Sequence, residues 1–164
     1  MPRAVLSLAP VLAVLLTVGC GQGSRVATLA DDVARATRLD SDEVLRLAQP
    51  EADAAGRSTD DLLRGWSSSL RDAATRYREV PAEERAVACD AVTTVLSDSL
   101  DGNPATDPNP LLAAASAVAG ANPTVGRRAL ADDLTKAAGQ VQAGQPSALT
   151  LLMLKTGVCQ VAGA

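Results

Sequence analysis

From residue 24 onward, hydrophobic positions recur every three or four residues, which is the spacing of one face of an α-helix. The clearest stretch begins at Ser58, a good N-cap residue with Asp61 three places on, and is expected to run to about residue 80. Its apolar positions form one helical stripe: Leu63, Trp66, Leu70, Ala73, Tyr77 and Val80. Such a stripe predicts a packing seam between helices.

Start and stop signals divide the rest of the chain into further helices. The expected ranges are 24–38, 40–50, 81–100, 111–120, 122–143 and 146 onward. Pro50 is expected to stop the second of these, and Asn122-Pro123 to supply a cap and a first residue. Pro81 suits the first turn of the helix after the seam. Because that connection is tight, the helices on either side of it are predicted to be antiparallel neighbours.

The same pattern gives the fold class. Only Val and Thr supply β-branched side chains, and no stretch alternates apolar and polar positions over a useful length, so strand signals are weak. Residues 111–120 are nearly all apolar and are expected to be buried, and residues 149–158 are expected to form the central helix. The sequence predicts an all-α fold, a compact bundle of five to six helices in a single domain, residues 25–164.

The first 19 residues have a different character. Ala4 to Val18 is an almost unbroken apolar run, shorter than the ~20 residues that a membrane-spanning helix needs. Arg3 carries the one charge among residues 2–23, and Pro10 disfavours a stable spanning helix. A short apolar run behind a basic lead is typical of a secretory signal peptide.

The apolar run ends in the letters LTVGC at residues 16–20, and here the chain resembles a bacterial lipoprotein signal sequence. In that family a small residue precedes a cysteine that receives the lipid and becomes the mature N-terminus, and Gly19 and Cys20 match. Thr17 departs from the pattern, since Leu is the usual residue three places before the cysteine. Ordinary signal cleavage near Gly19 and an uncleaved anchor are the alternatives.

The resemblance implies a signal peptide at residues 1–19 and lipidation of Cys20. Residues 20–24 would then carry the lipid and form a short flexible tether. Acyl chains contribute about 0.8 kcal/mol per buried CH₂, so several of them on Cys20 hold a protein on a membrane. The implied location is the cell envelope, with the protein anchored on the non-cytoplasmic side of a membrane.

Three cysteines are present: Cys20, Cys89 and Cys159. With Cys20 assigned to the lipid, the other two most economically form one disulfide in an exported protein. A bridge between Cys89 and Cys159 closes a loop of about 70 residues, which constrains the unfolded chain by ~4 kcal/mol in the chain-entropy model. Two separately buried free thiols are the alternative, and the absence of a CxxC motif disfavours a redox-active pair.

Composition narrows the function. The chain has no His and no Phe, and Trp66 and Tyr77 are its only aromatic residues. Catalysis and metal sites that need His are therefore excluded, and no cofactor is expected. The net charge of −4 argues against nucleic acid as a partner, because phosphate affinity comes from clustered Lys and Arg.

Several candidate sites each have a structural alternative. The acidic loop that begins at Asp98 lacks the spacing of an EF-hand calcium loop. Lys155 lacks a Ser-x-x-Lys partner, since Leu152 holds that place. Trp66 and Tyr77 are expected to pack in the core, or to contact a partner if the seam is partly open.

The densest basic cluster is interleaved with acidic residues, which indicates a mixed surface, with an anion-contacting patch as the alternative. Its members are Arg71, Arg76, Arg78 and Arg85.

Together these features predict a non-enzymatic helical domain, exported and lipid-anchored, that acts as an envelope adaptor or scaffold through protein–protein contacts. Its expected partners are an envelope protein and, through the lipid on Cys20, a membrane. The alternative is the binding of a small apolar or lipid-like ligand in a cavity between helices, for which a cavity of some hundreds of Å³ would be evidence.

Overall fold

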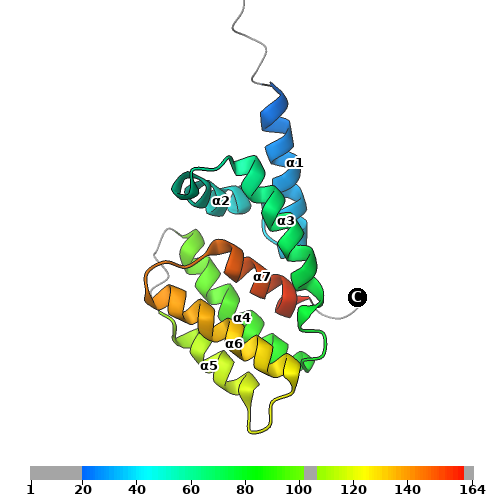
Figure 1. The fold of residues 1–164 in the computed structure, drawn as a ribbon, viewed down its shortest axis with the longest axis vertical. Coiled ribbons are helices and arrows are strands. Elements are labelled where there is room, and N and C mark those ends of the chain that lie inside the picture. Colours follow the sequence, from blue (N-terminus) through cyan, green and yellow to red (C-terminus); the bar gives the residue numbers. More distant parts are fainter. Residues whose placement is uncertain (1–19, 102–106, 161–164) are drawn as a thin grey trace, which may run out of the picture.

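The computed structural model describes residues 20–101 and 107–160, and within these ranges the chain forms seven helices and no strand (Figure 1). The helices are α1 Cys20–Thr37, α2 Ser41–Ala55, α3 Thr59–Arg76, α4 Ala82–Leu100, α5 Asn109–Ala119, α6 Val125–Gln142 and α7 Ala148–Cys159. The predicted all-α class is therefore confirmed. The signal peptide predicted at residues 1–19 lies outside the described residues, and the lipid and tether at residues 20–24 stay predictions.

The expected number of helices, five to six, was wrong: the described residues form seven, one for each range that the start and stop signals mark out, the two short ranges included. A glycine in the left-handed region ends α2, with Gly56 at φ 61°. Another follows α5, with Gly120 at φ 51°. Residues with a side chain rarely adopt this conformation, so glycine gives each of these short helices a sharp end.

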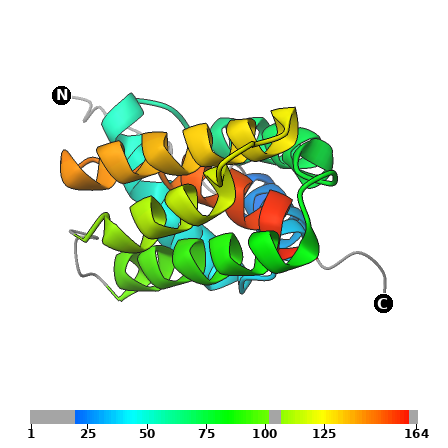
Figure 2. The same cartoon turned by 90° about the horizontal axis from the view of Figure 1, so that it is seen from below.

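The helix α7 lies at the centre of the bundle, as the sequence predicted. It packs on α3 on one side and on α4 on the other, with α1–α3 above it and α4–α6 below it in Figure 1. Seen from below in Figure 2, α4, α5 and α6 lie side by side in front of it. Its leucines at 151, 152 and 154 and Val158 are all buried, because this helix has apolar residues on every side.

The predicted pairing of α3 with α4 was wrong. These two helices have almost no contact with each other, since α7 lies between them and packs on both. Pro81 still begins α4, as its N-cap. The connection is short, but α7 has apolar residues on every side and can bury them only between neighbours, so it takes the place between α3 and α4.

The seam predicted on α3 is confirmed. All six of its members are buried, with exposed fractions between 0% and 3%. The Ser58 hydroxyl accepts a hydrogen bond from the backbone N–H of Asp61, at 3.1 Å, and so caps the helix as predicted. The helix ends at Arg76, earlier than expected, and Tyr77 and Val80 are buried in the turn that follows.

The helix α2 continues past Pro50, which the sequence analysis expected to stop it. Pro50 lies on the exposed side of the helix, where the carbonyl group that loses its partner can bond to water. The buried stripe of Val44, Leu47 and Ala48 continues on to Ala52, so burial beyond the proline offsets its cost.

Two further expectations on the lower helices were wrong. The N-cap of α6 is Thr124 rather than Asn122, since the Thr124 hydroxyl accepts a hydrogen bond from the backbone N–H of Arg127 at 3.3 Å. The helix α5, expected to be buried, has one exposed face, on which Leu112 is 41% exposed.

Because α2 extends past Pro50, Glu51 reaches the first turn of α7. Its Oε1 atom accepts a hydrogen bond from the backbone N–H of Ala148. Burial raises the pKa of the half-buried Glu51 carboxyl above its ordinary value of 4.5, and hydrogen bonds from the backbone at Ala148 and Leu149 act in the opposite direction. The raised pKa means that the fold favours the protonated form of this carboxyl.

A pH dependence of stability follows from Glu51. The stability that the protonated Glu51 carboxyl adds to the folded state is fully present below pH 4.5, the ordinary pKa. It is lost as the pH rises through the raised pKa of the folded protein. Relative to wild type, Glu51→Gln should therefore become more stable as pH rises through this window. Urea unfolding of both proteins at several pH values measures this, with Glu83→Gln on the exposed side of α4 as the control. A stability difference that stays constant with pH would contradict the assignment.

Candidate functional site

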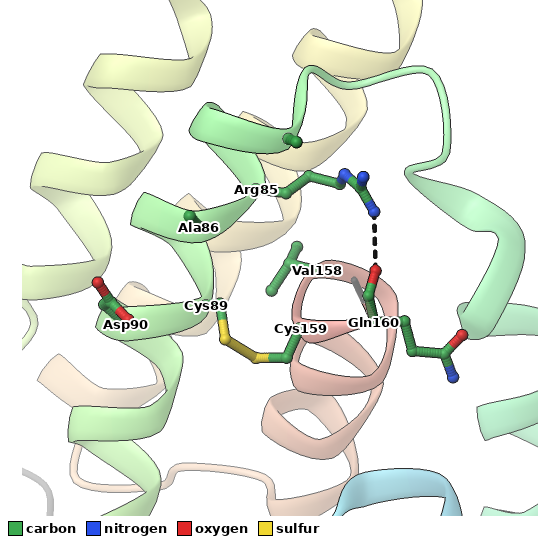
Figure 3. Close-up of a pocket in the computed structure, with 8 residues that line it drawn as sticks. Arg85, Ala86, Cys89, Asp90, Val158, Cys159 and Gln160 are labelled. Atoms are coloured by element: carbon green, nitrogen blue, oxygen red, sulfur yellow. Dashed lines mark hydrogen bonds between the residues drawn. A yellow bond between two sulfur atoms is a disulfide. The ribbon is translucent and has the colours of Figure 1, made fainter. Parts of the chain in front are cut away.

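The predicted disulfide is confirmed: Cys89 in α4 is bonded to Cys159 at the end of α7 (Figure 3). The two Cα atoms are 5.0 Å apart, and 70 residues separate them in sequence. Cys89 lies on the side of α4 that faces α7, and Cys159 ends the helix that fills the centre of the bundle. The bridge therefore ties the central helix to the lower half of the molecule.

A pocket of about 350 Å³ lies beside the disulfide, between the first half of α4 and the end of α7. Its wall is mainly apolar. The lining residues are Ala82, Arg85, Ala86, Cys89, Asp90, Val158, Cys159 and Gln160, drawn in Figure 3. The small side chains of the alanines leave this space open next to the two sulfur atoms.

Arg85 is the unusual residue of this pocket, because its charged side chain is only 9% exposed. Its Nε atom donates to the backbone carbonyl of Val80 at 3.1 Å, and its Nη1 atom donates to that of Gln160 at 3.0 Å. No carboxylate of the described residues lies within ion-pair distance of it. Among the described residues, the Arg85 guanidinium is thus held by neutral backbone carbonyls and not by a counter-charge, and an anion that reaches it would be stabilised.

Arg85 was not predicted as a separate feature, because its neighbours in the sequence indicate a mixed basic surface. Its companions Arg71 and Arg78 are indeed exposed, and Arg76 pairs with Asp133 at 2.8 Å. The missed signal is the position of Arg85, which lies four residues before Cys89 and seven before Val92, on the same helical face.

The two aromatic residues lie in the core, as the core-packing alternative predicts. Trp66 is 1% exposed and Tyr77 is 3% exposed, so the seam they belong to is closed. The Tyr77 hydroxyl donates to Asp133 at 2.6 Å. Burial raises the pKa of Tyr77 well above its ordinary value, and the hydrogen bond to Asp133 adds to this. This hydroxyl is therefore a hydrogen-bond donor and serves to position the ring.

A second hollow and Lys155 are the other candidate features of the described residues. A hollow of about 440 Å³ between α1 and the start of α3 has a more polar wall, lined by Ser58, Asp60 and Asp61 among others. Burial lowers the pKa of Lys155 on α7, and the charge of Glu43 on α2 opposes this. Within residues 20–101 and 107–160 no three metal-ligating side chains gather, and no helix in that part of the chain is long and apolar enough to cross a membrane.

Comparisons of the chain with protein-family models, curated proteins and solved structures gave no match.

Proposed function

We propose that this protein is an exported, lipid-anchored helical domain that acts without catalysis, as an adaptor or scaffold of the cell envelope. The observation that carries the proposal is the disulfide between Cys89 and Cys159. Disulfides persist in compartments outside the reducing cytosol, which is where a lipoprotein-like signal sequence directs a chain. Two features far apart in the sequence thus support the same location.

The contact surface that we assign to this adaptor is the outer face of α5. This helix has no charged side chain, and its exposed residues are Asn109, Leu112, Ala113, Ser116 and Ala117. Protein–protein interfaces are depleted of charge at their centre. The partner is an envelope protein with an uncharged surface of its own, and the lipid on Cys20 holds the adaptor at the membrane beside it.

A photo-crosslinking residue tests this surface in cells. Placed at Leu112, it should give one discrete crosslinked product in the envelope fraction, because the side chain is exposed in the middle of the uncharged face. The matched control is the same residue at Arg71, which is exposed on α3 in the other half of the bundle. Gel electrophoresis of crosslinked envelopes, followed by mass spectrometry of the product, is the measurement. Absence of a product at Leu112, or the same product at Arg71, would contradict the proposed surface.

A further inference from the structure

We propose that the pocket beside the disulfide binds a small amphipathic monocarboxylate, and that Arg85 holds its charged group. This binding function goes beyond the adaptor role and does not depend on it. The juxtaposition that carries it is a buried arginine that pairs with no carboxylate of residues 20–101 and 107–160, next to a mainly apolar pocket of about 350 Å³.

The hydrogen bonds of Arg85 fix the position of its guanidinium without neutralising it. Two backbone carbonyls accept from Nε and Nη1, and both are uncharged groups. The Nη2 atom has no hydrogen-bond partner among the described residues. A guanidinium has five N–H donors in a planar fork that matches the two oxygens of a carboxylate. An anion at Nη2 would therefore complete both the charge and the hydrogen bonding of this group.

The rest of the pocket suits an apolar body. Ala82 and Ala86 of α4 face Val158 of α7 across it, and the disulfide forms part of the wall. In Figure 3, Val158 of α7 lies between the disulfide and the Arg85 side chain. The volume is within the range of about 300–1,000 Å³ that small-molecule sites occupy. A ligand with a short hydrocarbon chain would thus bury that chain while its head group reaches Arg85.

Asp90 adds a negative charge to the wall of the pocket. In Figure 3, its side chain lies on the other side of α4 from the Arg85 guanidinium. A second negative charge on the ligand would be repelled by the Asp90 carboxylate. The site therefore favours a single carboxylate over a doubly charged phosphate monoester.

Calorimetric titration with three probes of equal chain length tests this inference. The protein is the disulfide-intact chain carrying Cys20→Ala, so that it has no acyl group of its own. Decanoate should bind. Decanol should bind at least about ten-fold more weakly, since it lacks the charged group that accepts a hydrogen bond from Arg85. Decyl phosphate should also bind more weakly than decanoate, because Asp90 repels its second negative charge. Equal binding of decanoate and decanol, or no binding of decanoate, would overturn the proposal.

Two substitutions locate the site. Arg85→Met should weaken decanoate binding by about ten-fold to a hundred-fold, whereas Arg71→Met, at an exposed arginine, should not change it. Ala86→Phe keeps Arg85 and fills the pocket, so it should abolish binding, while Ala113→Phe on the exposed face of α5 should not. If Arg85→Met fails to fold, the Ala86→Phe variant alone tests whether decanoate binds in this pocket. Unchanged binding in the Ala86→Phe variant would overturn the proposed site.

Protection of the disulfide gives a readout besides affinity. Because Cys89 and Cys159 line the pocket, a bound ligand covers their sulfur atoms. Decanoate should slow the reduction of the bridge by dithiothreitol several-fold in the parent protein and leave the rate unchanged in the Ala86→Phe variant. Equal reduction rates with and without decanoate in the parent protein would place the ligand elsewhere and contradict the inference.

Discussion

Replacing Cys89 and Cys159 together by alanine is expected to lower the free energy of unfolding by about 4 kcal/mol, because their bridge closes a loop of about 70 residues in the unfolded chain. For a chain of this size the loss corresponds to a fall in Tm of about 10–15 °C. Thermal and denaturant unfolding of the oxidised proteins measure it. The bridge joins the central helix α7 to α4, so its loss acts on the packing of the whole bundle.

The matched control for this double variant is Cys20→Ala, which makes the same chemical change at the cysteine outside the bridge. Its stability should equal that of wild type. The oxidised wild-type protein should also run faster on an unreduced gel than on a reduced one, and the double variant should not. Equal stability of the double variant and wild type would show that the bridge does not stabilise the fold.

Replacing Gly157 by alanine is expected to destabilise the protein by about 1–3 kcal/mol, the usual cost of overpacking a core. Gly157 lies in α7 against the ring of Tyr77, and an added Cβ atom would be 2.5 Å from Cδ2 and 2.7 Å from Cε2 of that ring. It would also be 3.0 Å from the backbone oxygen of Ala73. The ring has little room to move, since its hydroxyl is bonded to Asp133. Chemical unfolding of the variant measures the loss.

The control for Gly157 has the opposite expected sign. At Gly65 in α3 and Gly139 in α6, an added Cβ atom would meet nothing within 4 Å. Alanine is a better helix former than glycine by about 1 kcal/mol, so Gly65→Ala and Gly139→Ala should each stabilise the protein slightly. If Gly157→Ala also stabilises it, the close approach of α7 to Tyr77 described here is wrong.

The local features of the helices were the most predictable part of this fold. The stripe from Leu63 to Val80 and the cap at Ser58 depend on residues a few places apart, and both were found from spacing alone. The disulfide was also predictable, because two cysteines were left once Cys20 was assigned to the lipid. In each case the deciding information lies within the sequence pattern itself.

Features that depend on packing between distant segments were not predictable in the same way. Pro50 normally ends a helix, but here the burial of Ala52 beyond it continues α2. The short connection at Pro81 favoured a direct contact between α3 and α4, but α7 lies between them. Both outcomes depend on which apolar helix surfaces pack against each other. The spacing of residues along one helix does not specify this.

The candidate site was the hardest part to foresee. The pocket beside the disulfide depends on how α4 meets the end of α7, and these segments are far apart in the sequence. The burial of Arg85 could have been noticed from its place on the apolar face of α4, but its two carbonyl partners, at Val80 and Gln160, come from different parts of the fold. The sequence shows that Arg85 lies on the apolar face of α4, but it does not show which carbonyl groups Arg85 bonds to.

Intact-mass spectrometry of the protein isolated from its own cells tests the central claim, that the chain is exported, cut before Cys20, lipidated there and oxidised. The account predicts protein in the membrane fraction, with the mass of residues 20–164 plus a lipid and less the two hydrogens lost to the bridge. The Cys20→Ala variant should lack the lipid and leave the membrane. A soluble chain that retains residues 1–19 and contains reduced Cys89 and Cys159 would contradict the account.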